Sequence, residues 1–287
     1  MSKPWLLLDV SNMAYRSMYA MRDLRYGNSA TGAIYGVFRE LVGLMELFGT
    51  AKCVWCFDAG CQVRKDLYDG YKSNRKQSLD MSEEEKQFRA DLRKQLELLR
   101  TKVLGSMGFK NICWQQDFEA DDMIASICGD YSEEKEFIIV STDQDMYQLL
   151  SESVSIYNPM SRKSVTKESF ENEYNIGVHN WAKVKAIAGC TSDSIPGIKG
   201  VGEVTAIKYL NGELSETTKA WENIHSQLDL VARNLKLTRL PMPETLSFSL
   251  EKDKVSQEKW NEGVKSMGMN TLVGQYPMYL KKKGMGL

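Results

Sequence analysis

The feature that most constrains the fold of this chain is a series of short apolar segments that alternate with helical patterns. Residues 5–10 read WLLLDV, 53–57 read CVWCF and 137–141 read FIIVS. Each is rich in leucine, β-branched or aromatic side chains, as is typical of a strand buried on both faces. Apolar residues recur at helical intervals over 33–48, and a further helix is expected to begin near Ala120. Strands that alternate with helices predict an α/β fold around a parallel sheet.

Carboxylates follow all three predicted strands. Asp9 ends the first strand, Asp58 follows the second, and Asp143 and Asp145 follow the third. One aspartate after a strand is usually a turn residue. The carboxyl ends of parallel strands, however, meet at one edge of the sheet, where ligands bind. Three strands that present carboxylates there predict a functional pocket.

The helix start FEADDM adds more acids at an edge where strand-to-helix loops gather: Glu119, Asp121 and Asp122. Acidic residues in a first helical turn are ordinary capping chemistry and alone would be a weak signal. Clustered carboxylates with neither histidine nor thiolate suit hard cations such as Mg²⁺ or Mn²⁺. Two such ions about 4 Å apart stabilise the attacking and leaving oxygens of phosphodiester hydrolysis. An Asp-x-Asp after a strand also occurs in metal-dependent glycosyltransferases, which stay open as an alternative here.

Other classes of site and location are disfavoured. The two histidines, His179 and His225, have no neighbouring partner that indicates a triad or a zinc site. No apolar run approaches a membrane span and no signal-peptide layout is present, so we expect a cytoplasmic protein with no membrane partner. Cys53 and Cys56, three apart on a strand, should point to opposite faces, so we expect reduced, unpaired thiols. The net charge of −1 does not by itself indicate a nucleic-acid partner.

A glycine-rich turn, GIKGVGEVTA, lies between two helical patterns. Gly197, Gly200 and Gly202 let backbone N–H groups approach a phosphate, as in a helix-hairpin-helix. Lys199 and Lys208 add charge suited to a non-specific grip on a nucleic-acid backbone. The same glycines would also serve a turn between packed helices, but the spacing together with the lysines favours phosphate binding.

The segment 62–110 combines positive charge with a long amphipathic helix over 81–107. Its apolar residues recur every three or four positions: Phe88, Leu92, Leu96, Leu99 and Val103. A charged helix of this kind is usually a solvated face packed on a core. Lys72 and Arg75 are better placed for function, because they follow Asp58 closely and can lean over the acidic pocket.

Several stretches together resemble the flap endonuclease family of 5′ nucleases, which includes phage 5′-3′ exonucleases and the amino-terminal nuclease domain of bacterial DNA polymerase I. They are LLLDVSNMAYRSMYA, TGAIYGVFREL, FDAG with Arg64, YKSNR, EADDMIA, STDQDMYQLL and SDSIPGIKGVGEVTA, in the family's order. The resemblance implies a PIN-like 5′ nuclease core, with a mostly parallel central sheet flanked by helices. It also implies a helical arch, at about 62–110, over the active site. The core would span 1–175, and 176–287 would hold a helix-three-turn-helix (helix-hairpin-helix) DNA-binding region and a C-terminal extension packed on the core.

The resemblance also implies an activity and partners. It indicates a structure-selective phosphodiesterase that degrades DNA from 5′ ends and cuts 5′ flaps in replication or repair. Two Mg²⁺ or Mn²⁺ ions would serve catalysis, and K⁺ would assist the helix-hairpin-helix. Expected partners are DNA with free 5′ ends or 5′ flaps, RNA–DNA primers, and a replication polymerase or single-strand-binding protein. A ribonuclease-H-like preference stays open, and a monomer is the default expectation.

Position by position, the resemblance assigns these metal-site carboxylates: Asp9, Asp58, Glu119, Asp121, Asp122, Asp143, Asp145 and Asp193. It places four side chains at the scissile phosphate and the frayed 5′ nucleotide: Arg16, Tyr71, Lys72 and Arg75. Tyr71 would stack on a displaced base, and Lys72 would neutralise charge on the phosphate. Lys185 falls where a helix-hairpin-helix lysine meets the DNA backbone.

One position departs from the family pattern. Gly189-Cys190 stands where members commonly have Gly-Asp, although Asp193 is kept. A thiol is a poor Mg²⁺ ligand, and on helical geometry Asp193 would lie one turn from Cys190. The expected outcomes are an active enzyme with a relaxed second metal site, an altered balance of endo- and exonuclease activity, or a weak nuclease. The alternative function is a catalytically weak or inactive protein of the same fold that binds branched DNA.

Overall fold

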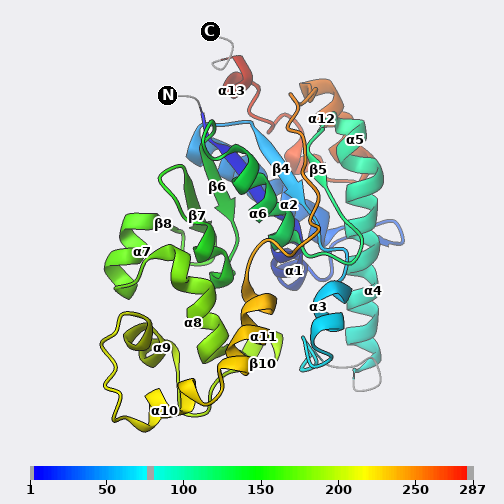
Figure 1. The fold of residues 1–287 in the computed structure, drawn as a ribbon. Coiled ribbons are helices and arrows are strands. Elements are labelled where there is room, and N and C mark those ends of the chain that lie inside the picture. The colour runs from blue at the N-terminus through cyan, green and yellow to red at the C-terminus, as the bar shows by residue number, and fades with distance from the viewer. Residues whose placement is uncertain (1–2, 76–80, 283–287) are drawn as a thin grey trace.

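The computed structural model describes residues 3–75 and 81–282, and within them a six-stranded sheet forms the centre in the order β5-β4-β1-β6-β7-β8. The strands are β1 Trp5–Asp9, β4 Cys53–Cys56, β5 Ile112–Cys113, β6 Phe137–Val140, β7 Val154–Asn158 and β8 Lys163–Val165. Neighbouring strands of this sheet pair in parallel, except β7 and β8, which are antiparallel. Helices cover both faces (Figure 1). The predicted α/β fold with a mostly parallel sheet is confirmed.

The remaining elements surround this sheet. The helices before residue 175 are α1 Val10–Ala20, α2 Gly32–Phe48, α3 Gln62–Leu67, α4 Glu83–Leu98, α5 Leu104–Met107, α6 Ala120–Tyr131 and α7 Lys167–Tyr174. Those after it are α8 Trp181–Ala188, α9 Glu203–Leu210, α10 Lys219–His225, α11 Leu228–Thr238, α12 Gln257–Ser266 and α13 Met278–Lys282. Short strands pair as β2 Arg25–Tyr26 with β3 Ser29–Ala30 and as β9 Gly189–Cys190 with β10 Ile195–Pro196. In the described part of the chain, no helix combines the length and the apolarity needed to cross a bilayer.

Strand register brings the predicted acids to one edge of the sheet. Asp9 pairs with Cys56, two residues before Asp58, and Leu8 pairs with Val140, three residues before Asp143. Because β1 lies between β4 and β6, its carboxyl end stands between the ends of the other two strands. The three strand ends therefore meet, as the sequence predicts.

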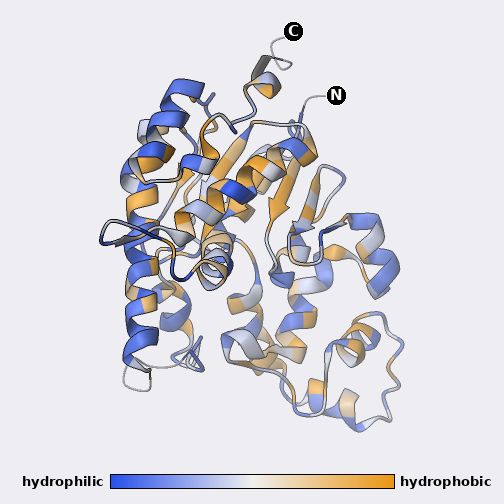
Figure 2. Ribbon diagram, turned by 180° about the vertical axis from the view of Figure 1, so that it is seen from behind, coloured by the Kyte–Doolittle hydropathy of each residue, from blue (hydrophilic) through white to orange (hydrophobic). Residues whose placement is uncertain are grey.

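Two hydrophobic cores hold the sheet, one on each face. In β1, Leu6 and Leu8 belong to the core shared with α1 and α2, whereas Leu7 belongs to the core shared with α6 and α8. The sheet strands are apolar, and the solvent-facing sides of several helices are hydrophilic (Figure 2). Cys53 and Cys56 also fall in different cores, and no disulfide joins any of the six cysteines, all of which lie within the described residues. The predicted opposite orientation of this pair is confirmed.

The C-terminal segment belongs to the first core. Trp260 of α12 packs against Phe38 of α2 with ring centroids 5.2 Å apart, and its Nε1 donates to Leu272 O at 2.8 Å. Each fully buried large side chain of this kind adds about 1.5–3 kcal/mol to the free energy of unfolding, because its apolar area is removed from water. Residues 255–280 therefore anchor to the N-terminal half of the chain rather than to the neighbouring α8–α11.

The predicted amphipathic helix forms α4, a π-helical turn (Leu99–Val103) and α5. Ser82 caps it by accepting a hydrogen bond from Glu85 N at 3.2 Å. Gln95 Oε1 accepts from Ala33 N at 2.9 Å, so one face of α4 is fastened to the start of α2. The described part of the expected arch is thus anchored to the body along that face. Residues 76–80, also in this segment, lie outside the described residues.

Candidate metal and phosphate-binding site

Asp9 lies at the centre of the sheet edge, where β1 ends and α1 begins. Its Oδ1 accepts a hydrogen bond from Asn12 N at 3.1 Å, and its Oδ2 accepts one from Ser141 Oγ at 2.9 Å. Burial, followed by the charges of Asp58 and Asp143, raises the pKa of Asp9 to about 7. A buried carboxylate in this condition lacks compensating positive charge, which a bound cation would supply.

Asp58 and Asp143 flank Asp9 and are exposed. Asp58 Oδ1 accepts a hydrogen bond from Ala120 N at 2.8 Å and so ties the end of β4 to the start of α6. Asp143 Oδ1 accepts one from Asp145 N at 2.9 Å and caps a 3-10 turn. Within the described residues, the other oxygen of each makes no hydrogen bond and is available to a ligand.

A second group of donors joins β6 to the segment after α8. One ligand atom from each of Asp145, Cys190 and Asp193 lies within 4.8 Å of the others. Burial and a neighbouring carboxylate raise the pKa of Asp145 to about 7, and burial and the charge of Asp145 raise the pKa of the Cys190 thiol to about 11. The predicted helical spacing is wrong, because α8 ends at Ala188 and Cys190 lies in β9. A 3-10 turn brings Asp193 beside Cys190 instead.

Glu119 organises the positive side chains. Its Oε2 accepts hydrogen bonds from the Tyr71 hydroxyl at 2.7 Å and from Arg64 Nη1 at 3.2 Å, and its Oε1 accepts one from Lys72 Nζ. Burial opposes ionisation, but Lys72 and Arg64 outweigh it and hold the pKa of Glu119 below its usual value. Lys72 Nζ also lies 3.5 Å from Asp193 Oδ1. Glu119 therefore holds Lys72 against the second donor group.

The metal assignment of Asp122 is not supported by its contacts. Asp122 is fully buried, and Arg64 Nη1 and Nη2 donate to its two oxygens at 2.6 and 2.8 Å. The same oxygens accept from Glu119 N at 3.3 Å and Met242 N at 2.9 Å. With both oxygens occupied, Asp122 is the counter-ion of Arg64. Arg64 is not among the site residues predicted from the sequence, although it follows Asp58 closely in a stretch that carries the family resemblance.

Asp121, the neighbour of Asp122, is different. Its Oδ1 is buried, accepts no hydrogen bond within the described residues, and lies 3.8 Å from Arg64 Nη2. Burial raises the pKa of Asp121 well above its usual value, although the charge of Arg64 opposes the increase. An under-compensated oxygen of this kind fits a metal ligand.

Four side chains were predicted to meet the scissile phosphate, and they occupy different environments. Tyr71 is 2% exposed and packs with Ile195 and Leu237, so its ring is not available to stack on a displaced base, contrary to the prediction. Arg75 is exposed and lies 3.7 Å from Asp193. Arg16 is engaged elsewhere, pairing with Glu40 at 3.0 Å, and donates to the Asn12 side chain. Lys72 remains beside the carboxylates.

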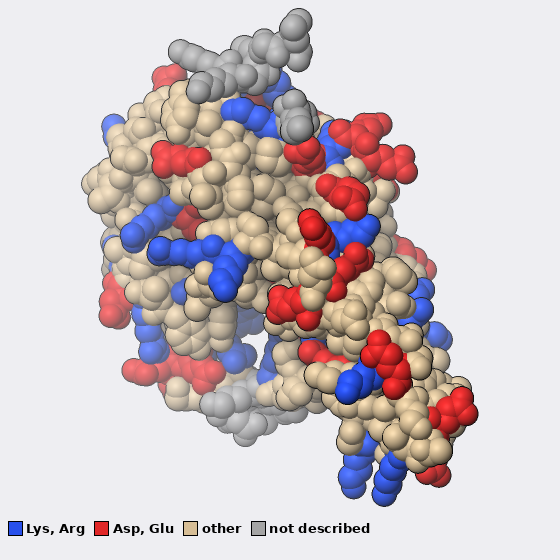
Figure 3. Space-filling model, turned by 90° about the vertical axis from the view of Figure 1, so that its left-hand side faces the viewer, with Lys and Arg blue, Asp and Glu red and all other residues tan. Residues whose placement is uncertain are grey.

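The turn between α8 and α9 has the predicted helix-hairpin-helix outline. Gly197 packs tightly, because a Cβ there would lie 2.0 Å from Ala188 O, whereas Gly200, with φ +79°, and Gly202 face open space. Lys199 and Lys208 are exposed. In Figure 3, Lys and Arg side chains project from the lower end of the molecule, where Figure 1 places α9 and α10. Gly197 is therefore a packing glycine, and the open backbone lies nearer α9.

Lys185 is not positioned to contact a DNA backbone. Its side chain is 9% exposed, and its Nζ donates to Glu203 Oε1 at 2.7 Å and lies 3.8 Å from Asp145 Oδ1. The ammonium also lies 5.0 Å from the centre of the Trp181 ring. Lys185 thus links the acidic site to the start of α9, and the predicted backbone contact is not supported.

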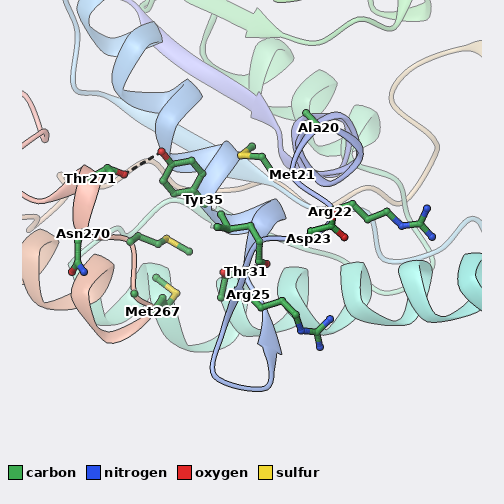
Figure 4. Close-up of a pocket in the computed structure, with 13 residues that line it drawn as sticks. Ala20, Met21, Arg22, Asp23, Arg25, Thr31, Tyr35, Met267, Asn270 and Thr271 are labelled. Carbon is green, nitrogen blue, oxygen red and sulfur yellow. Dashed lines mark hydrogen bonds between the residues drawn. The ribbon is translucent and has the colours of Figure 1, made fainter.

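A separate cavity of about 540 Å³ opens near the end of α1 and the segment after α12. Arg22, Arg25, Met267 and Tyr35 contribute to its lining, and Thr271 donates to the Tyr35 hydroxyl at 3.1 Å (Figure 4). Asp23 is the one acidic side chain among the described residues that line it. The cavity contains none of the carboxylates described above and belongs to a different part of the molecule.

Comparison with known proteins relates this chain to 5′-3′ exonucleases and to DNA polymerase I. Residues 4–175 match the family model of the 5′-3′ exonuclease N-terminal resolvase-like domain. The chain is 28% identical over 270 residues to the 5′-3′ exonuclease of Aquifex aeolicus, covering 91% of this chain and 89% of that protein. It is 29% identical over 257 residues to the thermostable DNA polymerase I of Thermus thermophilus, covering 87% of this chain but only 28% of the polymerase.

Solved structures share the fold. The zinc-bound T5 5′-exonuclease superposes with a TM-score of 0.72 at 22% identity, covering 83% of this chain and 90% of that one. The catalytic core of Rad2 in complex with DNA substrate superposes with a TM-score of 0.57 at 15% identity, covering 97% of this chain and 92% of that one. Together with the family match over most of the chain, these comparisons lead to one conclusion: the chain belongs to the 5′-3′ exonuclease family.

Proposed function

We propose that this chain is a divalent-metal-dependent 5′ nuclease that hydrolyses DNA phosphodiester bonds from 5′ ends and at 5′ flaps during replication or repair. The observation that carries the proposal is the meeting of five carboxylates and a lysine: Asp9, Asp58, Asp143, Asp145 and Asp193, with Lys72. Family membership and the name of the Aquifex aeolicus relative support the same activity.

The residues present fit divalent cations. Asp9 and Asp145 have pKa values raised by burial and like charge, and Asp121 has a buried oxygen without a hydrogen bond. Mg²⁺ or Mn²⁺ at these oxygens would supply the charge that activates water and stabilises the leaving oxygen. Asp58 and Asp143 would complete the set of carboxylates that hold the ions. No histidine base is required for this chemistry.

The positive side chains would bind the phosphate. Lys72 is directed at the acidic edge by Glu119 and Asp193, so its ammonium is already in place to neutralise charge that develops on the phosphate oxygens. Arg75, on the exposed side of Asp193, would contact the next phosphate outward. Tyr71 fixes Glu119 through its hydroxyl and so acts on Lys72 indirectly.

The α8–α9 turn would hold duplex DNA. Gly200 and Gly202 leave the backbone open, and Lys199 and Lys208 are exposed beside them. These groups suit binding to the phosphate backbone of DNA of any sequence. We propose that the turn also binds K⁺. Specificity would come from DNA structure, and RNA–DNA primers, a polymerase or a single-strand-binding protein are the associated partners that we propose.

The direct test is the choice of substrate. We expect cleavage of a 5′-labelled flap duplex near the junction in Mg²⁺ or Mn²⁺, slow cleavage of the matching 3′ flap, and no cleavage of a circular single strand. Equal rates on all three substrates would contradict a 5′ nuclease.

One observation favours a second candidate, a branched-DNA-binding protein without catalysis. The second donor group contains the thiol of Cys190, where the resemblance implies a carboxylate, and a thiol binds Mg²⁺ poorly. Flap binding without product in either Mg²⁺ or Mn²⁺ would identify this alternative.

A further inference from the structure

The two parts of the acidic site differ in ligand chemistry. Asp9, Asp58 and Asp143 offer carboxylate oxygens, which suit hard cations such as Mg²⁺. The second group instead combines the Cys190 sulfur with oxygens of Asp145 and Asp193, all within 4.8 Å of one another. A cation held there would therefore meet one soft and two hard donors.

The sulfur is held in this position by the backbone. Cys190 pairs with Ile195 across the β9–β10 ladder. Gly189, with φ +83°, permits the close approach of the two segments, since a Cβ there would lie 2.4 Å from Gly197 N. Cys190 is 8% exposed, so it is a buried group directed at its neighbours rather than a surface thiol.

The sulfur contacts one carboxylate of the donor group and one neighbouring hydroxyl. Cys190 Sγ is 3.9 Å from Asp145 Oδ2 and 3.0 Å from Ser192 Oγ. Two lysines border the group, with Lys185 Nζ 3.8 Å from Asp145 and Lys72 Nζ 3.5 Å from Asp193. A cation must compete with these ammonium groups for the two carboxylates. A cation that also forms a strong bond to sulfur competes better than one that binds oxygen alone.

We propose that Asp145, Cys190 and Asp193 form a metal site selective for thiophilic divalent cations of the Zn²⁺ class over Mg²⁺. One sulfur and two carboxylate ligands leave an open position, the ligand number of catalytic zinc sites. On binding, the thiol S–H bond breaks, its proton passes to solvent, and the sulfur electron pair forms the bond to the cation. The inference rests on the proposed function, because it specifies the metal of the second group in that same site.

The test is a titration of the metal-free full chain with Co²⁺ and Cd²⁺, without DNA. We expect a thiolate-to-metal charge-transfer absorption that saturates at about one equivalent, as one thiol site requires. The Cys190→Ser variant should lose this absorption and bind Cd²⁺ about 100-fold more weakly. Cys61→Ser is the matched control, because Cys61 is partly buried and lies outside the donor group; it should retain the absorption.

A third variant tests selectivity. Cys190→Asp should lose the charge-transfer absorption and bind Mg²⁺ about tenfold more tightly than the wild type, since it replaces sulfur with a hard oxygen donor. A wild type without the absorption, or an absorption that persists in Cys190→Ser, would overturn the proposal. Because this readout requires no cleavage, failure of the nuclease assay alone would count against the proposed function and leave the metal site standing.

Discussion

Arg64 and Asp122 form a two-pronged ion pair directly behind the acidic site, with donor–acceptor distances of 2.6 and 2.8 Å. Their side chains are 2% and 0% exposed. The same guanidinium donates to Glu119 and lies 3.8 Å from Asp121. A fixed positive charge behind the first turn of α6 thus offsets the repulsion among its acids.

The first prediction separates Asp122 from its neighbour Asp121. Asp122→Ala leaves Arg64 as a buried charge without its main partner, so the free energy of unfolding should fall by about 3–5 kcal/mol. Asp121→Ala should cost less than about 1 kcal/mol and should mainly weaken metal-dependent cleavage. Urea unfolding and cleavage assays on both variants make the comparison. Equal losses of stability would refute the structural assignment of Asp122.

The second prediction concerns the Tyr71 hydroxyl. Tyr71→Phe keeps the aromatic ring but removes the hydrogen bond to Glu119, which helps to hold Lys72. We expect a loss of about 1–2 kcal/mol in the free energy of unfolding. Cleavage should slow about tenfold or more, with little change in flap affinity. If the ring stacked on DNA, this variant would cleave like the wild type and Tyr71→Leu would lose affinity.

The third prediction distinguishes buried from exposed lysines near the α8–α9 turn. Lys199→Ala and Lys208→Ala should each weaken duplex binding. Each should also reduce the slope of the logarithm of the binding constant against the logarithm of the salt concentration by about one unit. Lys185→Met should leave that dependence unchanged but destabilise the fold by about 1–3 kcal/mol, because Glu203 and Asp145 lose their partner. Fluorescence anisotropy over a range of salt concentrations checks both statements. A reduced salt dependence in Lys185→Met would restore the predicted backbone contact.

The fourth prediction links metal binding to stability through Asp9. The Asp9 carboxylate is buried among like charges, so Asp9→Asn should raise the free energy of unfolding of the metal-free protein by about 1–2 kcal/mol. Mn²⁺ should then stabilise the wild type more than the variant. Asp130→Asn, a change at an exposed position of α6, is the control and should alter neither quantity. A variant less stable than the wild type in EDTA would argue that Asp9 is a structural acceptor.

The sheet and its acidic edge could be predicted from the sequence, because local patterns determine both. The strands at 5–9, 53–56 and 137–140 are short apolar runs, and Asp9, Asp58 and Asp143 lie at the end of a strand or within three residues after it. Parallel pairing then brings the ends together with no further information. The family resemblance added Asp193 to the predicted metal-site carboxylates, although this residue lies in a distant segment of the chain.

Apart from the local helical spacing expected for Cys190 and Asp193, the wrong or unsupported predictions depend on contacts between distant segments. Asp121 and Asp122 are adjacent in sequence but about 100° apart around α6, so only one can face the sheet edge, and the partner that decides this is Arg64. Tyr71 is buried by residues of β10 and α11, more than a hundred positions away. Lys185 donates a hydrogen bond to Glu203 on the other side of the α8–α9 turn, and this contact keeps its ammonium group away from the surface. None of these pairings has a local signature.

We propose that the carboxylates at the sheet edge hold the metal ions required for hydrolysis. The most direct measurement is single-turnover cleavage of a 5′-labelled flap in Mg²⁺ and in Mn²⁺, with flap affinity measured in parallel, for the wild type, Asp143→Ala and Asp130→Ala. We predict cutting near the junction by the wild type and Asp130→Ala. Asp143→Ala should bind the flap as tightly as the wild type but cleave it at least about 100-fold more slowly. Cleavage by Asp143→Ala at the wild-type rate, or tight flap binding by a wild type that never cuts in either metal, would contradict the account.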